Sequence, residues 1–365
     1  MNKELLEIIK YFKRARPEST KTVLATVVDV KGSSYRLPGA RMLIGDDGEM
    51  LGTVSGGCLE ADVLERASQV LQTGTPEVFT YDTTSQEDSV FSLNMGCRGV
   101  IRILLERPKL EFIDFFRRLY KTRHNGLAVT LIDAKTETRL VGARLIFDEG
   151  SLIKSDFSQE ITKDLLPDCL AVLQEKKSKL LENDFGEFFL EFIPSSVSLV
   201  IFGAGADVIP VADAAKNLGW HTTIVDHRAA FANKERFPAA DEIILTRAEN
   251  LAENLTIDEN TVGVVMSHNY EHDKNILRFL LNSDARYIGA LGPKRRTENI
   301  LREWRDAAEH FSDEQLSRLY APIGLDIGAD TPESIALSII AEIKSVLTNR
   351  NGGFLRQRIG SIYNR

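Results

Sequence analysis

The sequence of 365 residues has little cysteine and no long apolar segment. Its three cysteines, Cys58, Cys97 and Cys169, lie far apart and form no C-x-x-C pair. This spacing excludes a disulfide scaffold and argues against a structural zinc site. No apolar run reaches the roughly 20 residues that a membrane-spanning helix needs. The first 20 residues mix Lys and Glu with Leu and Ile, which predicts an amphipathic surface helix rather than a signal peptide. We therefore expect a cytoplasmic protein.

Positive charge is also in deficit. The chain has 45 Lys and Arg against 53 Asp and Glu, a net charge of −8. A mildly acidic surface repels phosphate backbones, which argues against nucleic acid as a partner. Hydrophobic residues make up 43% and charged residues 27%, ordinary globular values that argue against a disordered or fibrous chain. At roughly 150 residues per domain, the length predicts two or three domains.

The N-terminal part reads as a glycine-rich α+β domain. Its pattern predicts strands over 22–30, 41–44, 49–54 and 100–105, with a helix over 59–71. Paired strands over 126–133 and 140–147, a helix over 161–181 and a strand over 185–193 follow, and no internal repeat is apparent. Residues 110–193 carry no recognisable motif. The linker Pro194-Ser195-Ser196 sets the predicted domains at residues 1–194 and 195–365.

From residue 198 onward, strands and helices alternate. Strands are predicted over 198–203, 221–226, 242–246, 261–267 and 286–291, with helical patterns between them. This alternation predicts an α/β, Rossmann-like doubly wound parallel sheet.

A glycine motif follows the first of these strands. Gly203 would permit a tight turn, and Gly205 would let a phosphate approach the start of the next helix, beside Asp207. Asp226 ends the next strand, where a carboxylate commonly accepts a ribose hydroxyl. Val208 replaces the third glycine of the dinucleotide motif. The pattern therefore leaves open a dinucleotide site and a Rossmann-like fold without one.

A second glycine-rich region surrounds the first cysteine. Ser55, Gly56 and Gly57 lead into Cys58 at a predicted helix start, where the helix dipole favours a thiolate. Upstream loops add the cations Arg36 and Arg41. The segment 94–99 repeats the Gly-Cys pattern at Cys97. The alternative is that Cys58 and Cys97 are buried in tight turns, and Cys169 is predicted to be a core residue.

Histidines follow the strand that ends near residue 265. His268 and His272 are four residues apart, a spacing used for metal ligands, with Asp273 as a third candidate. A polar ligand-binding role for His268 is favoured over a metal site, and the alternative is a hydrogen-bonded loop. The basic loop 289–296 suits a phosphate, or is a solvated helix start.

Taken together, these segments resemble the XdhC/CoxI family, the accessory proteins of xanthine and carbon monoxide dehydrogenases. The segments that carry the resemblance are GSSYRLPGARM at 32–42, GTVSGGCLEADV at 52–63, MGC at 95–97, IFGAGADVIP at 201–210, VDHR at 225–228, MSHNYEHD at 266–273, IGALGPKRR at 288–296 and APIGLDIGADTPESIALSIIAEI at 321–343. Arg98-Gly99 follows Cys97 where family members commonly carry Gly-Gly.

The resemblance implies a chaperone that binds the molybdenum cofactor (molybdopterin), protects it, supports its sulfuration and delivers it to a molybdenum hydroxylase. Its partners would be a client such as xanthine dehydrogenase, a cysteine desulfurase and a second copy in a homodimer. Cys58 and Cys97 are the candidates for handling sulfur or metal, with Cys58 as a molybdenum contact. The candidate cofactor-binding residues are Arg36, Arg41, Ser55, Gly56, Gly57, Gly203, Gly205, Asp207, Asp226 and His268.

Two other functions stay open at this point. An NAD(P)-dependent oxidoreductase would use Gly203, Gly205 and Asp226, with His268 as its acid–base residue. A structural adaptor is a third hypothesis, against which the polar loops at three strand ends argue. We expect the ligand to lie between the two domains, because the glycine-rich loops of both need a facing surface.

Overall fold

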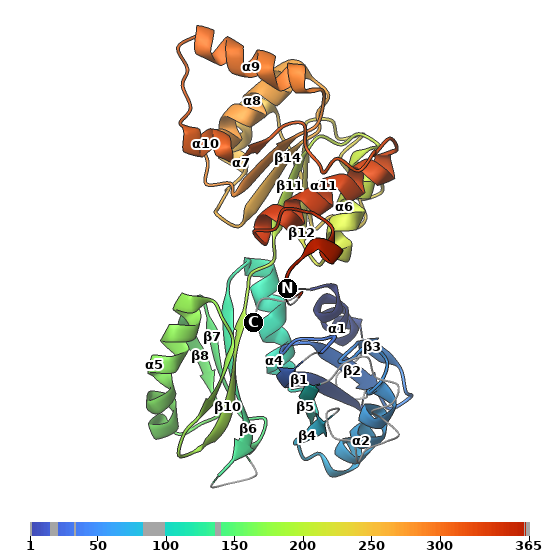
Figure 1. Ribbon diagram of the computed structural model, residues 1–365, viewed down its shortest axis with the longest axis vertical. Helices are drawn as coiled ribbons and strands as arrows, with labels where there is room; N and C mark the ends of the chain where they lie inside the picture. The colour runs from blue at the N-terminus through green and yellow to red at the C-terminus, as the bar shows by residue number, and fades with distance from the viewer. Residues whose placement is uncertain are drawn as a thin grey trace. The chain divides into compact units, whose positions relative to one another are not determined.

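The computed structural model describes residues 2–14, 21–32, 34–82, 99–135, 140–360 and 362. The chain divides into two compact units, Met1–Ser195 and Ser196–Arg365, which we call unit 1 and unit 2 (Figure 1). Within the described residues, no helix is long and apolar enough to cross a membrane.

The first half of unit 1 is an antiparallel sheet with two helices. Five strands lie in the order β3-β2-β1-β5-β4. The elements are α1 (Lys3–Arg14), β1 (Thr22–Gly32), β2 (Arg41–Gly45), β3 (Met50–Gly52), α2 (Glu60–Thr73), β4 (Glu77–Asp82) and β5 (Gly99–Glu106). The predicted N-terminal amphipathic helix is present as α1, and its apolar side chains are buried.

The second half of unit 1 repeats this arrangement. Its strands lie in the order β8-β7-β6-β10-β9. The elements are α4 (Leu110–Thr122), β6 (Gly126–Ala134), β7 (Arg144–Asp148), β8 (Ser151–Ser155), α5 (Gln159–Glu175), β9 (Lys179–Glu182) and β10 (Gly186–Ile193). The helix predicted over 161–181 is too long, because Lys176 adopts a left-handed conformation that ends α5 before β9.

The expectation that no internal repeat exists is therefore wrong. Residues 37–41 read LPGAR and residues 140–144 read LVGAR, at the same place in each half. Gly39 donates its backbone N–H to Val27 of β1, and Gly142 donates in the same way to Leu131 of β6. The repeat escapes sequence inspection because the strands conserve apolar character while their residue identities differ.

The two halves share a hydrophobic core. It is formed by the buried faces of α1 and α4 together with side chains of both sheets: Leu5, Leu6, Ile8, Ile9, Phe12, Leu24, Leu43, Phe112, Ile113, Phe115, Phe116, Leu119, Ala128, Ile146 and Ile193. Each half also has its own core, under α2 and under α5 respectively.

Unit 2 is a six-stranded sheet in the order β13-β12-β11-β14-β15-β16, and its strand pairs are parallel. This is the doubly wound order of dinucleotide-binding proteins, so the predicted fold class is confirmed. The strands are β11 (Ser198–Phe202), β12 (His221–Asp226), β13 (Glu242–Leu245), β14 (Thr261–Val265), β15 (Tyr287–Ala290) and β16 (Leu319–Tyr320).

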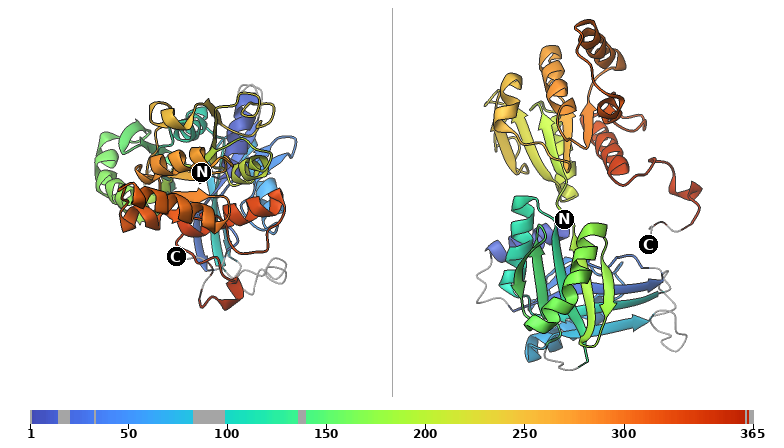
Figure 2. Two further views of the ribbon diagram at one scale, coloured as in Figure 1. Left: turned by 90° about the horizontal axis from the view of Figure 1, so that it is seen from above. Right: turned by 90° about the vertical axis from the view of Figure 1, so that its left-hand side faces the viewer.

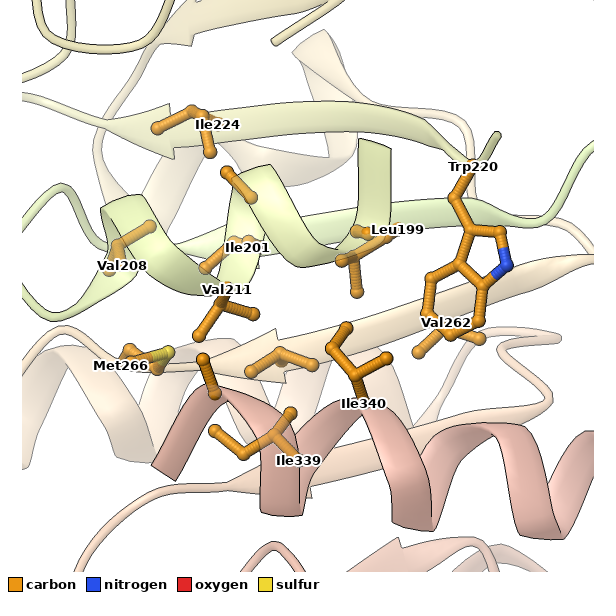
Figure 3. Packing of buried hydrophobic residues seen from close by; sticks show 14 of the residues in the cluster. Leu199, Ile201, Val208, Val211, Trp220, Ile224, Val262, Met266, Ile339 and Ile340 are labelled. Carbon is orange, nitrogen blue, oxygen red and sulfur yellow. The ribbon is translucent and has the colours of Figure 1, made fainter. Parts of the chain in front are cut away.

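Helices cover both faces of this sheet. The helices are α6 (Val208–Asn217), α7 (Leu251–Asn254), α8 (Tyr270–Leu281), α9 (Lys294–Asp306), α10 (Asp313–Ser317) and α11 (Pro332–Leu347). Figure 3 shows Val208 and Val211 of α6 and Ile339 of α11 packed with side chains of β11 and β14. Side chains of α8 and α9 form the core on the other face. The residues after α11 lead away from the sheet (Figure 2).

Candidate functional site

The loop between β3 and α2 is held by a network of polar side chains. Ser55 Oγ accepts hydrogen bonds from the backbone N–H groups of Gly57 (3.2 Å) and Leu59 (3.1 Å). Glu60 accepts from Thr53 Oγ1 (2.6 Å) and from the Ser55 backbone N–H (3.0 Å), and Ser55 Oγ also donates to it. Ser55, Thr53 and Glu60 therefore fix the path of the chain on both sides of Cys58.

Cys58 lies in this loop with an exposed thiol. Its Sγ is 3.7 Å from Ser55 Oγ. Gly57 has φ +103°, and a Cβ added there would meet no atom within 4 Å. The buried alternative is thus excluded for Cys58, whose side chain is exposed. An exposed thiol on a fixed loop can act as a soft metal ligand or as a nucleophile.

The start of α2 differs from the expectation in one respect. The helix begins at Glu60, two residues after Cys58. The backbone N–H of Leu59, at the start of the helix, donates to Ser55 Oγ and to Glu60 Oε2 (3.2 Å). Burial alone would raise the pKa of Glu60, but the hydrogen bonds from Ser55 and Thr53 lower it below its ordinary value. A charged carboxylate therefore belongs to this loop. Sequence reasoning missed Glu60 and Thr53, although both flank the glycines.

Two of the predicted cations pair with carboxylates inside unit 1. Arg36 donates to Glu4 of α1 (Nη1–Oε1, 2.9 Å). Arg41 is buried and donates to Glu191 of β10 (Nη1–Oε1, 2.8 Å) and to the Gly39 carbonyl (2.9 Å). A phosphate would have to displace Glu191 to reach Arg41. We therefore assign Arg41 a structural role.

The internal repeat supports this assignment of Arg41. In the second half, Arg144 stands at the same register position and donates to Glu106 of β5 (2.9 Å) and to the Gly142 carbonyl (3.0 Å). Both guanidinium groups also face the ring of Phe112, at 5.6 Å for Arg41 and 4.0 Å for Arg144. Each ion pair thus joins the two halves, and each half supplies the arginine of one pair and the glutamate of the other.

The other two cysteines of unit 1 do not join Cys58 in the described site. Cys97 lies outside the described residues. Cys169 is fully buried in α5, which confirms its predicted place in the core, and burial raises the pKa of its thiol to about 12.

Tyr35 is exposed and its ring lies against Gly56, where an added Cβ would be 3.5 Å from the Tyr35 Cγ. Tyr35 is therefore a neighbour of the Cys58 loop that the sequence analysis did not single out.

In unit 2, the carboxyl ends of the strands surround a cavity of about 240 Å³, which we call the Asp226 pocket. Arg228 binds both carboxylate oxygens of Asp226, with Nε–Oδ1 at 2.9 Å and Nη2–Oδ2 at 2.7 Å. Burial would raise the pKa of Asp226, but the bonds from Arg228 lower it. The lining residues are Phe202, Gly203, Val225, Asp226, His227, Arg228, Thr246, Ala248, Leu251, Ser267, Asn269, His272 and Ile276.

The glycine loop after β11 lies beside this pocket. Gly203 has φ +126°, and an added Cβ would collide with the Met266 backbone, so only glycine fits. Val208, in place of the third glycine, is fully buried and packs in the core beneath α6. Asp207 precedes α6 and its Oδ2 is 2.8 Å from His268 Nε2. Gly203, Asp207 and His268 thus lie close together. They follow β11 and β14, and the carboxyl ends of neighbouring parallel strands meet at one edge of the sheet.

The histidine segment does not form a metal site. His268 is bonded to Asp207, and Asp273 is buried and paired with Arg296 (2.5 Å). His272 instead contacts the edge of His227, with ring centroids 5.1 Å apart. Within the described residues, no three His, Cys, Asp or Glu side chains are placed to hold a metal ion.

The basic loop opens on a second, shallower hollow of about 370 Å³. Its lining residues are His268, Tyr270, Pro293, Arg295, Arg296 and Asn299. Lys294, the third cation of this loop, is 3.9 Å from Glu298 on the exposed side of α9. Arg295 and His268 therefore share one hollow beside the glycine loop.

Comparison with known proteins gives two family matches. Residues 199–343 match the XdhC Rossmann domain, and residues 15–82 match the XdhC and CoxI family. A crystal structure from Bacillus halodurans, described as a xanthine dehydrogenase, has a similar fold, with a TM-score of 0.76, 31% identity and coverage of 96% of this chain and 97% of that one.

Two curated proteins are similar over most of their length. One, from Bacillus subtilis, is described as a probable subunit of xanthine dehydrogenase and is 32% identical over 89% of this chain and 93% of that protein. The other is the molybdenum cofactor insertion chaperone PaoD of Escherichia coli, 24% identical over 93% of this chain and 87% of that protein. On these matches, the chain belongs to the XdhC and CoxI family.

Proposed function

We propose that this protein is an accessory protein of a xanthine dehydrogenase-type molybdenum hydroxylase, and that it binds the molybdenum cofactor as cargo. The exposed Cys58 thiol on its fixed glycine loop is the observation that carries the proposal. The similarity to PaoD, described as a molybdenum cofactor insertion chaperone, supports it. The protein would hold and hand over the cofactor without turnover of its own.

The Cys58 loop has the chemistry that such a cargo needs. A thiolate is a soft ligand, suited to a metal centre that already carries sulfur. Gly57, the residue before Cys58, has open space where a side chain would stand, and the exposed ring of Tyr35 lies at Gly56. Ser55 and Glu60 keep the loop in one conformation, which reduces the ordering cost of binding.

Three parts of the proposal rest on the family resemblance. These are protection and sulfuration of the cofactor with a cysteine desulfurase as sulfur donor, delivery to the hydroxylase client, and action as a homodimer. A pull-down of purified partners and light scattering of the free protein would test the partner and the dimer respectively.

Cofactor retention tests the central claim. Molybdenum cofactor released from a purified molybdenum enzyme would be mixed with the protein, and the molybdenum that stays with it through gel filtration measured. We expect Cys58→Ala to lose at least tenfold in retention, while Cys169→Ala, which removes a buried thiol, retains cofactor as the wild type does. Equal retention by Cys58→Ala, with an unchanged circular dichroism spectrum, would refute the role of Cys58.

A second candidate is an NAD(P)-dependent oxidoreductase. The strand order of unit 2 and Asp226 at the end of β12 favour it, because dinucleotide-binding proteins use both. Retention of NADH measured beside retention of the molybdenum cofactor distinguishes the two. Binding of NADH without binding of the cofactor would support the oxidoreductase.

A further inference from the structure

Unit 2 places a negative charge of its own where dinucleotide-binding proteins place a diphosphate. In those proteins the diphosphate approaches the second glycine of the motif, at the start of the first helix. Here that glycine is Gly205, and a Cβ added to it would collide with Asp207 Oδ1. The carboxylate of Asp207 therefore lies over Gly205.

His268 holds the carboxylate in this position. Asp207 makes no side-chain capping bond to α6, and it bonds instead to His268 Nε2 at 2.8 Å. His268 follows β14, and its backbone has φ +56°, a left-handed conformation that is uncommon for residues other than glycine. His268 Cδ2 is 3.9 Å from the same added Cβ on Gly205. The ring and the carboxylate together cover the glycine.

A diphosphate would meet two obstacles at this place. The carboxylate fills the space above Gly205, and its charge repels an anion that would otherwise be attracted to the helix start. Dinucleotide binding depends on this phosphate seat. The loop therefore disfavours NAD(P), although the strand order around it is that of a dinucleotide-binding protein.

The Asp226 pocket beside the loop remains accessible to a smaller ligand. Its apolar surface comes from Phe202, Val225, Ala248, Leu251 and Ile276, which suits the faces of a flat ring. Asp226 Oδ1 accepts from two nitrogens of Arg228, whereas Oδ2 accepts from Nη2 and has a second lone pair for a ligand hydroxyl or N–H group. The bonds from Arg228 lower the pKa of Asp226, so this acceptor is charged. At about 240 Å³, the cavity is smaller than the roughly 300–1,000 Å³ of pockets for drug-sized ligands.

We propose that the Asp226 pocket binds a flat bicyclic nitrogen heterocycle with a hydroxylated substituent, and that Asp207 excludes ligands that carry a diphosphate. A purine nucleoside and a pterin share this chemistry. Binding of a pterin would rest on the proposed function, since molybdopterin is a pterin, whereas binding of a purine nucleoside and the exclusion by Asp207 do not depend on it.

The exclusion is tested with NADH as the probe. Fluorescence titration is carried out on the wild type, Asp207→Ala, Asp207→Asn and Asp213→Ala. Asp213 is an exposed acid on α6, the helix that Asp207 precedes, so its replacement controls for the change in net charge. We expect Asp207→Ala to bind NADH at least tenfold more tightly than the wild type and Asp213→Ala, and Asp207→Asn shows how much of that gain is due to charge. Equal NADH binding by all four proteins, whether tight or absent, would overturn the exclusion.

The pocket is tested by calorimetry with adenosine and with neopterin. We expect at least one of them to bind the wild type and Asp207→Ala with equal affinity, because neither carries a diphosphate. Asp226→Asn should weaken that binding at least fivefold. The tighter of the two ligands identifies the heterocycle, and absence of binding by both would overturn the assignment of the pocket.

Discussion

Arg41 of the first half of unit 1 pairs with Glu191 of the second, while Arg144 of the second half pairs with Glu106 of the first. All four side chains are buried. The exchange means that each half supplies one cation and one carboxylate to the other. The two pairs therefore hold the halves together by the same interaction, made twice.

Breaking the Arg41–Glu191 pair should lower the stability of the fold substantially. Arg41→Met leaves Glu191 buried without its partner, and we expect a loss of about 3–5 kcal/mol in the free energy of unfolding. The double variant Arg41→Met/Glu191→Met should recover most of that loss, because no unpaired charge remains. Urea unfolding followed by circular dichroism measures both. Arg117→Met, which breaks an exposed pair with Asp114 on α4, should cost only about 0–1 kcal/mol. Similar losses for Arg41→Met and Arg117→Met would contradict the structural role of Arg41.

Thiol reactivity should separate the described cysteines. In a Cys97→Ser background, we expect Cys58 to react with a thiol reagent in the folded protein and Cys169 to react only after unfolding. The physical reasons are the exposure of Cys58 and the burial of Cys169, whose thiol has its pKa raised to about 12. Counting modified thiols in native buffer and in urea checks this. Two fast thiols in native buffer would show that α5 is not packed as described.

Acid should weaken the Cys58 loop through Glu60. The folded-state pKa of Glu60 is lowered, so its carboxylate stabilises the fold above its unfolded pKa, and this contribution is lost as the pH falls through the folded pKa. Glu60→Gln should therefore lose less stability than the wild type as the pH falls below about 4.3, the ordinary pKa of a glutamate, towards the lower folded-state pKa. Glu65→Gln, an exposed change on the same helix, should follow the wild type. Parallel pH curves for Glu60→Gln and the wild type would rule this out.

Two glycines with positive φ should respond differently to substitution. Gly203→Ala places a Cβ against the Met266 backbone, whereas Gly150→Ala meets nothing within 4 Å. Both variants carry a backbone strain of about 1–2 kcal/mol, and only Gly203→Ala adds a steric clash. We expect Gly203→Ala to be at least about 2 kcal/mol less stable than Gly150→Ala. Thermal and urea unfolding compare them, and equal losses would show that the turn after β11 can relax.

Local patterns predicted much of the fold. The alternation after residue 198 gave the strands of unit 2, because each strand and helix has its own apolar period. Gly203 was found because its turn requires glycine, and the exposed position of Cys58 is consistent with its glycines. These features depend on residues that are close together in the sequence.

The features that the sequence did not reveal depend on distant residues. Arg41 was expected to bind a phosphate, yet its partner Glu191 is 150 residues away. Asp207 was placed among the cofactor-binding residues, but its contact with His268 lies 61 residues along the chain. Spacing carries no information on such pairs, and a cation in a glycine-rich segment looks the same whether it faces a ligand or a carboxylate.

Because unit 1 contains a repeat, the connection from the third strand of a half to its following helix occurs twice in the chain, from β3 to α2 and from β8 to α5. Between sheet and helix, the first half has residues 53–59, with Cys58, and the second half has only residues 156–158. The short version shows the minimum that this architecture requires, since Ser158 caps α5 by accepting the N–H of Ile161. The extra length in the first half is thus not needed to close the fold. The seven residues of the longer connection place an exposed thiol on a framework that the second half builds without one.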